Sequence, residues 1–480
     1  MTEFDEVYYK KLVDGLEVSE VVFSALERTN RIDAEFYQKD NLFVDAVLNK
    51  RDKIAIKQCF NVSDGNHMSI SASFCDNGIP YYRGQDIYNM FIENSNPLCI
   101  SKKAYDKPVM HRSHLKKGDV LMSIVGAIIG NSALVTSDRP ATCSCKLAIL
   151  RQNSDDIFPE TLLVFIKTKY GQSQIQKFKR GAAQTGLLLE DFDQLFIPNF
   201  LNSFQLKVRK ILNEIKELSM KSEKIMSEAE KILEKELELH NCVWQKERCK
   251  IQSFLESFGK SGRMDAEYYQ SEYDNYDNLL KQYHNGYGLL GDICTIKDKN
   301  FNPEPKTEYS YIELSDVGRQ GDISECNKIY GIDLPTRARR KVSAGDVILS
   351  SVEGSLSKCA LITPDCDGYL CTNGFYVVSC DSINPETLML LFKSRPIQAL
   401  LKKGCSGTIL SAIGKDELLK IPLPIIDITI QEKIMCMVTE SNLARRQGKE
   451  LLDKAIGLVE TAIEQGEDVA LNMQIISEKS

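Results

Sequence analysis

The sequence lacks the motifs of the common enzyme classes. Only five of its 480 residues are histidines, and none lies in a nucleophile motif or beside a cysteine cluster, which leaves nucleophilic catalysis without a candidate. No two prolines are adjacent, so the Asn-Pro-Pro-aromatic motif of adenine methyltransferases is absent. Gly259-Lys260-Ser261 resembles the end of a phosphate-binding loop, but Phe254 stands where that loop requires its first glycine. No G-x-G-x-x-G motif follows a predicted strand. We therefore predict a non-catalytic chain that binds no cofactor itself.

Long apolar runs, a secretory leader and paired metal-ligand spacings are also missing. The most apolar stretch, residues 120–130, contains serine and glycine and is far shorter than the ~20 residues that span a bilayer. The first residues have no basic start followed by an apolar core. The 15 cysteines are scattered, without zinc-ribbon spacing, and are predicted to be reduced thiols. We expect a cytoplasmic protein with no membrane segment and no structural metal.

The net charge of −7 and the pI of about 5.6 argue against a surface that is positive throughout. They do not exclude nucleic acid as a partner, because phosphate binding needs only a local basic surface. An acidic remainder can face other protein subunits.

An internal repeat is the main feature that is present. RIDAEFYQ at 31–38 returns as RMDAEYYQ at 263–270, with six of eight letters identical. Further pairs follow in the same order: 81–87 with 311–317, 117–123 with 344–350, 133–136 with 360–363, 143–150 with 371–378, 179–185 with 402–408, and 197–200 with 421–424. The offset changes by only a few residues, as small loop insertions would cause. The sequence therefore predicts a duplicated architecture.

Each half ends in a long segment with apolar residues at alternating spacings of three and four, which predicts helices over 202–240 and 427–466. Ser203 and Asp427 are the predicted N-caps, and Ser222 interrupts the first apolar seam. Within each half, short β-rich runs broken by Gly, Asp and Ser predict a twisted mixed or antiparallel sheet.

We therefore predict an α+β fold with two tandem α/β domains, each followed by a long helix. The helices are expected to pack as an antiparallel coiled coil with internal pseudo-twofold symmetry. The predicted boundaries are 1–200 for the N-terminal segment and first domain, 201–258 for the central helix and linker, 259–425 for the second domain, and 426–480 for the last helix and tail.

Basic and hydrogen-bonding side chains recur at matching places in the two halves. Cations precede a small glycine-containing loop in each half; these cations and the polar loop residues are Lys177, Lys179, Arg180, Gln184, Thr185, Lys402, Lys403 and Thr408. Other candidates for contacts to DNA are Asn66, His67, Arg83, Gln85, Arg112, Arg337, Arg339 and Arg340, and Arg112 belongs to a basic run with Lys102, Lys103, Lys107 and His111. Arg and Gln can contact a base edge bidentately, and flexible loops beside cations suit phosphate. A solvated surface patch is the other interpretation of any single cluster.

In their order, these motifs resemble the specificity subunits of type I restriction-modification enzymes. The resemblance rests on R-x-D-A-E-[FY]-Y at 31–37 and 263–269, on DGNH (64–67) followed by GIPYYRGQDI (78–87), on GDV strands after basic loops, on G-x-x-x-T loops before Ile-Pro, and on the two long helices. The halves differ at Arg83 and Gln85, whose counterparts are Glu313 and Ser315.

This resemblance implies a non-catalytic, sequence-specific DNA-recognition subunit with two target recognition domains that bind the halves of a bipartite duplex target. Two methyltransferase subunits would dock on it, together with translocating restriction subunits in a full complex. S-adenosylmethionine, and ATP with Mg²⁺, would belong to those partners. Two alternatives stay open: a recognition subunit of a related nuclease-free methylation or phage-defence system, and a pseudosymmetric scaffold that binds no DNA.

The repeated octapeptide is predicted to be structural, because its carboxylates would repel DNA. Arg31 and Arg263 are expected to pair with nearby acids. The aromatic residues beside them are expected to anchor the start of each domain.

Overall fold

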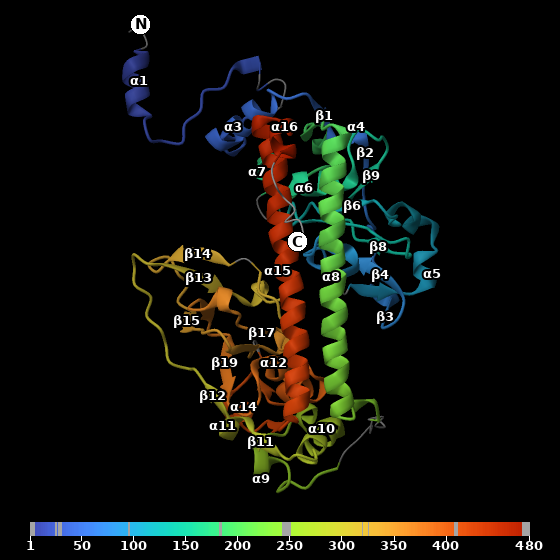
Figure 1. Ribbon diagram of the computed structural model, residues 1–480, viewed down its shortest axis with the longest axis vertical. Helices are drawn as coiled ribbons and strands as arrows, with labels where there is room; N and C mark the ends of the chain where they lie inside the picture. The colour runs from blue at the N-terminus through green and yellow to red at the C-terminus, as the bar shows by residue number, and fades with distance from the viewer. Residues whose placement is uncertain are drawn as a thin grey trace. The chain divides into compact units, whose positions relative to one another are not determined.

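The computed structural model describes residues 5–24, 26, 31–94, 97–181, 185–241, 251–318, 320–324, 326–407 and 411–472. They form two compact units, unit 1 with residues 1–220 and 445–480 and unit 2 with residues 221–444. Two long helices, α8 (Asn202–Glu236) and α15 (Ile428–Gln465), each contribute residues to both units (Figure 1). Helices and sheets occur together in each unit, which confirms the predicted α+β class. The boundary between the units falls within each long helix, at residues 220/221 and 444/445, whereas the sequence prediction treated each helix as a separate segment.

Unit 1 contains one antiparallel four-stranded sheet and a second, mixed one. Its elements in chain order are α1 (Glu6–Leu12), η1 (Ala34–Tyr37), α3 (Lys39–Leu48), β1 (Lys53–Ala55), α4 (Ile56–Cys59), β2 (Phe60–Asp64), η2 (Ser71–Ser73), β3 (Phe74–Cys75), β4 (Ile79–Tyr82), η3 (Gly84–Asp86), η4 (Ile92–Asn94), β5 (Leu98–Ile100), α5 (Lys102–Tyr105), η5 (Pro108–Ser113), β6 (Val120–Ser123), β7 (Ser132–Leu134), β8 (Thr142–Cys143), β9 (Leu147–Gln152), α6 (Pro159–Lys167), α7 (Lys169–Phe178), η6 (Leu189–Asp193), β10 (Phe196–Pro198) and α16 (Glu467–Leu471). The first sheet has the order β2-β9-β6-β7, and the second has the order β3-β5-β4-β8 with β4 and β8 parallel. The short strands β1 and β10 pair separately.

The first sheet of unit 1 is buried on both faces, and β6 shows why. Side chains alternate along a strand, so Val120 and Met122 point into the main core, which also contains residues of α6, α7, α8 and α15. Leu121, between them, points into a smaller core with Tyr82 and Cys143 of the second sheet. The first sheet thus lies between the helices and the second sheet, which we call the outer sheet.

Unit 2 repeats this plan. Its elements are η7 (Leu239–Asn241), α9 (Phe258–Ser261), η8 (Ala266–Tyr269), α10 (Ser271–Lys281), β11 (Tyr287–Leu289), α11 (Leu290–Ile293), β12 (Cys294–Ile296), β13 (Glu308–Ile312), η9 (Leu314–Asp316), β14 (Asn327–Tyr330), β15 (Ala338–Lys341), β16 (Val347–Ser350), η10 (Glu353–Ser355), β17 (Cys359–Leu361), η11 (Pro364–Cys366), β18 (Leu370–Thr372), β19 (Phe375–Cys380), α12 (Pro385–Lys393), α13 (Arg395–Lys403), β20 (Cys405–Ser406), β21 (Ala412–Ile413), α14 (Lys415–Leu419) and β22 (Pro422–Pro424). The first sheet has the order β12-β19-β16-β17, and the outer sheet has the order β14-β13-β18-β15 with β13 and β18 parallel. Val347 and Leu349 of β16 point into the main core and Ile348 into the smaller one.

A buried glutamine fixes the start of each long helix to its own unit. Gln205 accepts a hydrogen bond from the Phe158 N–H (2.7 Å) and donates to the carbonyls of Asp156 (2.7 Å) and Phe200 (2.9 Å). Gln431 lies 226 positions later and makes the same three contacts at positions 384, 382 and 426, each again 226 positions later. A second glutamine contact repeats with the same offset. Gln172 donates to the Ile166 carbonyl and Gln398 donates to the Phe392 carbonyl, each in the last turn of the preceding helix.

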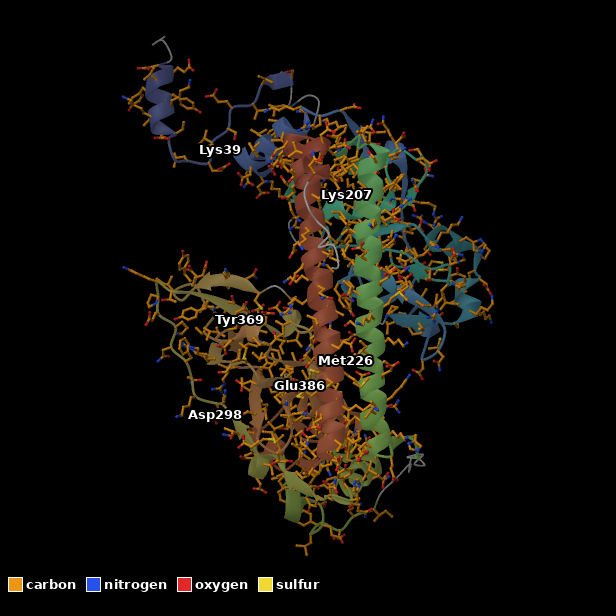
Figure 2. The ribbon with its side chains drawn as sticks, viewed as in Figure 1. Lys39, Lys207, Met226, Asp298, Tyr369 and Glu386 are labelled. Carbon is orange, nitrogen blue, oxygen red and sulfur yellow. The ribbon has the colours of Figure 1, made fainter. Side chains whose placement is uncertain are left out.

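The long helices pack in opposite directions within unit 1. Lys207 Nζ, labelled in Figure 2, donates to the Leu471 carbonyl (2.7 Å), whereas Ile215 lies beside Gly448, nearer the start of α15. Ser222 was predicted to interrupt the apolar seam, but in unit 2 it is part of the seam. It is buried, and its hydroxyl lies 2.9 Å from that of Ser441.

The helix boundaries differ slightly from the prediction. Asp427 is the N-cap of α15, because its carboxylate accepts from the Thr429 N–H (2.8 Å). Ser203 is not a cap, since α8 begins one residue before it. The helices end at Glu236 and Gln465, before the predicted ends at 240 and 466. Across the residues that the structure describes, no helix has the length and apolarity that crossing a membrane requires.

One ion pair of unit 1 is absent from unit 2. Arg209 of α8 lies 3.1 Å from Glu160 and 3.9 Å from the centre of the Phe158 ring. The corresponding positions, 226 residues later, are Met435 and Glu386 (labelled in Figure 2). Burial raises the pKa of Glu386, which has no basic partner among the described residues.

Candidate nucleic-acid interface

The repeated octapeptide is a structural motif with the same internal geometry in both units. In unit 1, Arg31 donates to both carboxylate oxygens of Asp33 (2.6 Å each), and the Tyr37 hydroxyl donates to the Arg31 carbonyl (3.0 Å). This pairing lowers the pKa of Asp33. Phe36, 4.9 Å from the guanidinium, and Tyr37 are both buried in the main core. The predicted structural role of the motif is confirmed here.

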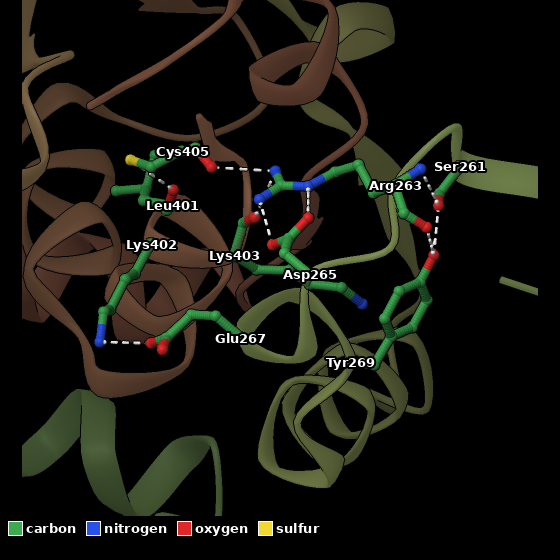
Figure 3. A network of polar contacts seen from close by, with 9 residues as sticks. All are labelled: Ser261, Arg263, Asp265, Glu267, Tyr269, Leu401, Lys402, Lys403 and Cys405. Atoms are coloured by element: carbon green, nitrogen blue, oxygen red, sulfur yellow. Dashed lines mark hydrogen bonds and ion pairs between the residues drawn. The ribbon is translucent and has the colours of Figure 1, made fainter. Parts of the chain in front are cut away.

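Unit 2 repeats these contacts around Arg263 (Figure 3). Its guanidinium donates to Asp265 (2.8 and 2.6 Å) and to the Cys405 carbonyl (2.9 Å) just after α13. The Tyr269 hydroxyl donates to the Arg263 carbonyl (2.8 Å). Tyr268 lies 4.5 Å from the guanidinium. The motif therefore attaches the start of each unit to the helix end that carries the predicted basic loop.

Most cations predicted to bind DNA beside the glycine loops form ion pairs with this starting segment. Lys402 lies 2.9 Å from Glu267, and Lys403 lies 3.2 Å from Asp274 and 5.2 Å from the Tyr268 ring (Figure 3 shows the Lys402 pair). In unit 1, Lys177 pairs with Asp45 of α3, whereas Arg180 pairs with Asp191 of η6, outside the starting segment. Lys177 is also buried, 4.2 Å from the Phe36 ring. Each of these four cations therefore has a carboxylate partner within its own unit.

Three polar candidates of unit 1 are also held by neighbours in the protein. Asn66 is buried and forms a closed turn, donating to the Met68 carbonyl (2.8 Å) and accepting from the Met68 N–H (3.0 Å). His67 lies 2.5 Å from Asp64. Arg83 donates to both carboxylate oxygens of Asp86 (2.9 and 3.2 Å).

The remaining candidates have varied surroundings. Arg112 pairs with Asp64, which it shares with His67, and Arg337 pairs with Glu313 (2.7 Å). Gln85 is exposed. Arg339 donates only to neutral oxygens, on Thr336 (2.9 Å) and Asn302 (3.2 Å). Arg340 likewise donates to Asn300 (3.1 Å) and to the Asp298 carbonyl.

The basic loops themselves are described only in part. Lys179 is half-buried and forms no ion pair within the described residues. The Thr185 carbonyl accepts a hydrogen bond from the Gly126 N–H (3.0 Å). Gln184 and Thr408 lie outside the described residues, so their predicted contacts stay predictions.

Two lysines that the prediction did not single out, Lys116 and Lys117, are exposed in unit 1. They directly precede Gly118-Asp119-Val120, the start of β6, and continue the basic run of residues 102–112. Their position just before a repeated Gly-Asp-Val strand is the feature of the sequence from which they could have been predicted.

No protein-family model matches the chain. The type I restriction enzyme HindI specificity subunit of Haemophilus influenzae is 26% identical over 155 residues, which are 31% of this chain and 33% of that protein. This stretch of the chain is therefore similar to a type I specificity subunit. The alignment spans about one third of this curated relative's length.

Solved specificity subunits are similar at low identity. The type I S subunit from M. genitalium is 12% identical, with 86% of this chain and 94% of that chain covered and a TM-score of 0.35. HsdS from Thermoanaerobacter tengcongensis is 16% identical, with 86% and 96% covered and a TM-score of 0.28.

The two units agree in their inner parts and differ in their outer sheets. The offset is 226 positions at the helices and glutamine contacts, 227 at the buried Asp119 and Asp346, and 230 at Asp86 and Asp316. Where unit 1 has α5 and η5 beside β8, unit 2 has strand β15 beside β18. Within the described residues, no group of three or more His, Cys, Asp or Glu side chains could hold a metal ion.

Proposed function

We propose that this chain is the sequence-specific DNA-recognition subunit of a type I restriction-modification system. Each unit would act as a target recognition domain for one half of a bipartite duplex target. The similarity to a type I specificity subunit supports the family assignment. The observation that carries the bipartite target is the duplicated inner structure with two different outer sheets.

The difference between the outer sheets has a physical meaning for recognition. Two unlike base sequences require different side chains, because each base pair presents its own pattern of donors and acceptors. The same frame must present both sets of side chains to equivalent stretches of duplex. A constant inner sheet and helix pair with a variable outer sheet meets both requirements, which a pair of identical domains would not.

The long helices are proposed to form an antiparallel coiled coil with pseudo-twofold symmetry that sets the spacing of the two half-sites. Their surfaces would dock two methyltransferase subunits and, in a full complex, restriction subunits. S-adenosylmethionine, and ATP with Mg²⁺, would be bound by those partners, and this chain would be non-catalytic. The predicted domain boundaries at 200, 258 and 425 belong to this proposal.

An exchange of recognition segments tests the proposal. Residues 60–195 would be replaced by the corresponding residues of a homologue with another target, and methylated adenines would be mapped by single-molecule sequencing in cells that express the methyltransferase. One half of the methylated sequence should change. The matched control exchanges only α6 and α7, residues 159–178, and should leave the sequence unchanged. A change in both halves would contradict the assignment of one half-site to each unit.

The spacer can be tested separately. A heptad inserted into both long helices, after residues 220 and 444, keeps the antiparallel seam in register and adds about 10 Å. The unspecified spacer should lengthen by about 3 base pairs, since ten base pairs span about 34 Å. An unchanged spacer would refute the role of the helices.

A nuclease-free methylation or phage-defence system would use the same chain, and genes for a restriction subunit next to this one would distinguish the two. A scaffold that binds no DNA is the remaining alternative. It predicts no binding of any duplex by the chain with its methyltransferase.

A further inference from the structure

We propose that in each unit the phosphates of the DNA bind along one basic edge of the outer sheet: residues 102–117 beside β8 in unit 1 and residues 337–341 beside β18 in unit 2. We call these segments the basic edges. This inference rests on the proposed function. It identifies the surface of the chain that contacts the sugar-phosphate backbone of the DNA.

The two segments occupy the same place although their structures differ. In unit 1, His114 pairs with Thr142 of β8 in an antiparallel bridge, and the Leu115 N–H donates to the Ala141 carbonyl (3.0 Å). In unit 2, β15 pairs antiparallel with β18, and the Val342 N–H donates to the Tyr369 carbonyl (3.0 Å). Both segments then lead directly into the Gly-Asp-Val strand of the first sheet.

The basic edge of unit 1 carries lysines whose charge no acid neutralises. Lys103, Lys107, Lys116 and Lys117 are exposed, and none forms an ion pair within the residues that the structure describes. Lys102 is different, because it pairs with Asp106 (2.7 Å). A chain with a net charge of −7 thus concentrates unpaired positive charge on one short segment.

The edge of unit 1 is also rigid. The rings of Tyr105 and His114 stack with centroids 3.7 Å apart, and His114 Nε2 lies 3.0 Å from the Tyr105 carbonyl. The Ser113 hydroxyl lies 2.7 Å from that of Thr142 on β8. The basic residues therefore project from a segment fixed to the sheet, so less side-chain and loop ordering opposes binding.

The basic edge of unit 2 is a strand in which four of five residues, 337–341, are Arg or Lys. Within the described residues, Arg339 and Arg340 donate hydrogen bonds to neutral oxygens and form no ion pair, although the Arg340 charge helps to lower the pKa of Asp298. Lys341 lies 5.3 Å from the Phe301 ring and forms no ion pair within the described part of the chain.

The cations beside the glycine loops differ in this respect. Lys402 and Lys403 would each have to leave a carboxylate, Glu267 or Asp274, before binding a phosphate. That exchange replaces one ion pair with another and gains little, whereas an unpaired lysine gains the full contact and releases counterions from the DNA. Phosphates are therefore expected at the basic edges rather than at the loops.

The test is the salt dependence of duplex binding by the chain with its methyltransferase, for wild type and three variants. The first replaces the four unpaired lysines of unit 1 by alanine. The second replaces the same four by arginine, which keeps the charge. The third is the matched control, in which four exposed lysines away from the basic edges and from both long helices become alanine: Lys11, Lys39, Lys50 and Lys281.

Each lost phosphate contact lowers the slope of log K against log salt by about 0.9. The alanine variant should lose a slope of two or more and bind at least about tenfold more weakly, with the preferred sequence unchanged. The arginine variant and the control should bind like wild type. An R339A/R340A/K341A variant should show the same behaviour for the edge of unit 2.

The outcomes separate the two proposals. If wild type binds no duplex, the proposed function fails. If wild type binds its target but the alanine variant matches the control in affinity and slope, the proposed function stands and the basic edges are refuted. Circular dichroism and the thermal midpoint of each variant establish that its fold is intact.

Discussion

Replacing the buried glutamine at the start of either long helix should destabilise the unit to which that helix is fixed. In Gln205→Leu, the Phe158 N–H and the Phe200 carbonyl lose their partner, while the exposed Asp156 can bond to water instead. A buried backbone group without a partner costs about 1–3 kcal/mol. With two such groups, and with some recovery from the apolar leucine, we expect the free energy of unfolding of unit 1 to fall by about 2–4 kcal/mol.

Gln431→Leu should have an effect of the same size on unit 2, because it makes the same three contacts. Urea unfolding combined with amide hydrogen exchange would locate each loss in its own unit. Gln447→Leu is the matched control, since this exposed residue lies on α15 and should change stability by less than about 0.5 kcal/mol. A loss below 1 kcal/mol, or one equal to that of the control, would refute the role of these contacts.

Three further changes have defined outcomes. Met435→Arg should give Glu386 the partner that its counterpart has in unit 1 and raise the free energy of unfolding, measured with urea, by about 0.5–1 kcal/mol at pH 7.5; burial raises the pKa of Glu386, and the gain should disappear as the pH falls through the pKa of that carboxyl in the variant. Ser441→Ala should cost about 1–2 kcal/mol, because it removes the hydroxyl that bonds the Ser222 hydroxyl and carbonyl; a double-mutant cycle with Ser222→Ala should show coupling, and additive losses would contradict the contact. Asp265→Asn should lower stability at pH 7. Its arginine partner holds the pKa of this carboxyl below 3.8, so the stabilisation is present above the unfolded pKa and lost as the pH falls through the folded one; a difference from wild type that persists in acid titration once the carboxyl is protonated would exclude this pair as its source.

Local sequence predicted the octapeptide well because its contacts are local. Arg31 and Asp33 are two residues apart, so their pairing depends on little else than the backbone between them. The same holds for Asp427 at the start of α15, whose carboxylate accepts from a backbone N–H two residues on. Repetition of such short motifs also predicted two similar halves in the correct order.

The sequence did not predict which candidate cations form ion pairs, because ion pairing is decided over long separations. Lys177 and Asp45 are 132 residues apart, and Lys403 and Asp274 are 129 apart. A run of cations beside a glycine loop gives no information about which carboxylate folds against it. Several cations predicted to contact DNA therefore also form ion pairs with the starting segments, and their contacts to DNA stay predictions.

The sequence by itself determined the number of units, the order of their elements, the two long helices and the resemblance to type I specificity subunits, because these follow from repeated local patterns of apolar, charged and turn-forming residues. Only the tertiary structure decided that Ser222 belongs to the helix seam and that an inner sheet lies between the helices and an outer sheet. It also decided that Lys116 and Lys117 are exposed without an ion pair within the described residues, whereas Lys402 and Lys403 each pair with a carboxylate. The free energy of a charge depends on its solvent and its nearest opposite charge. Both are properties of the folded chain, so neither can be obtained from the order of its residues alone.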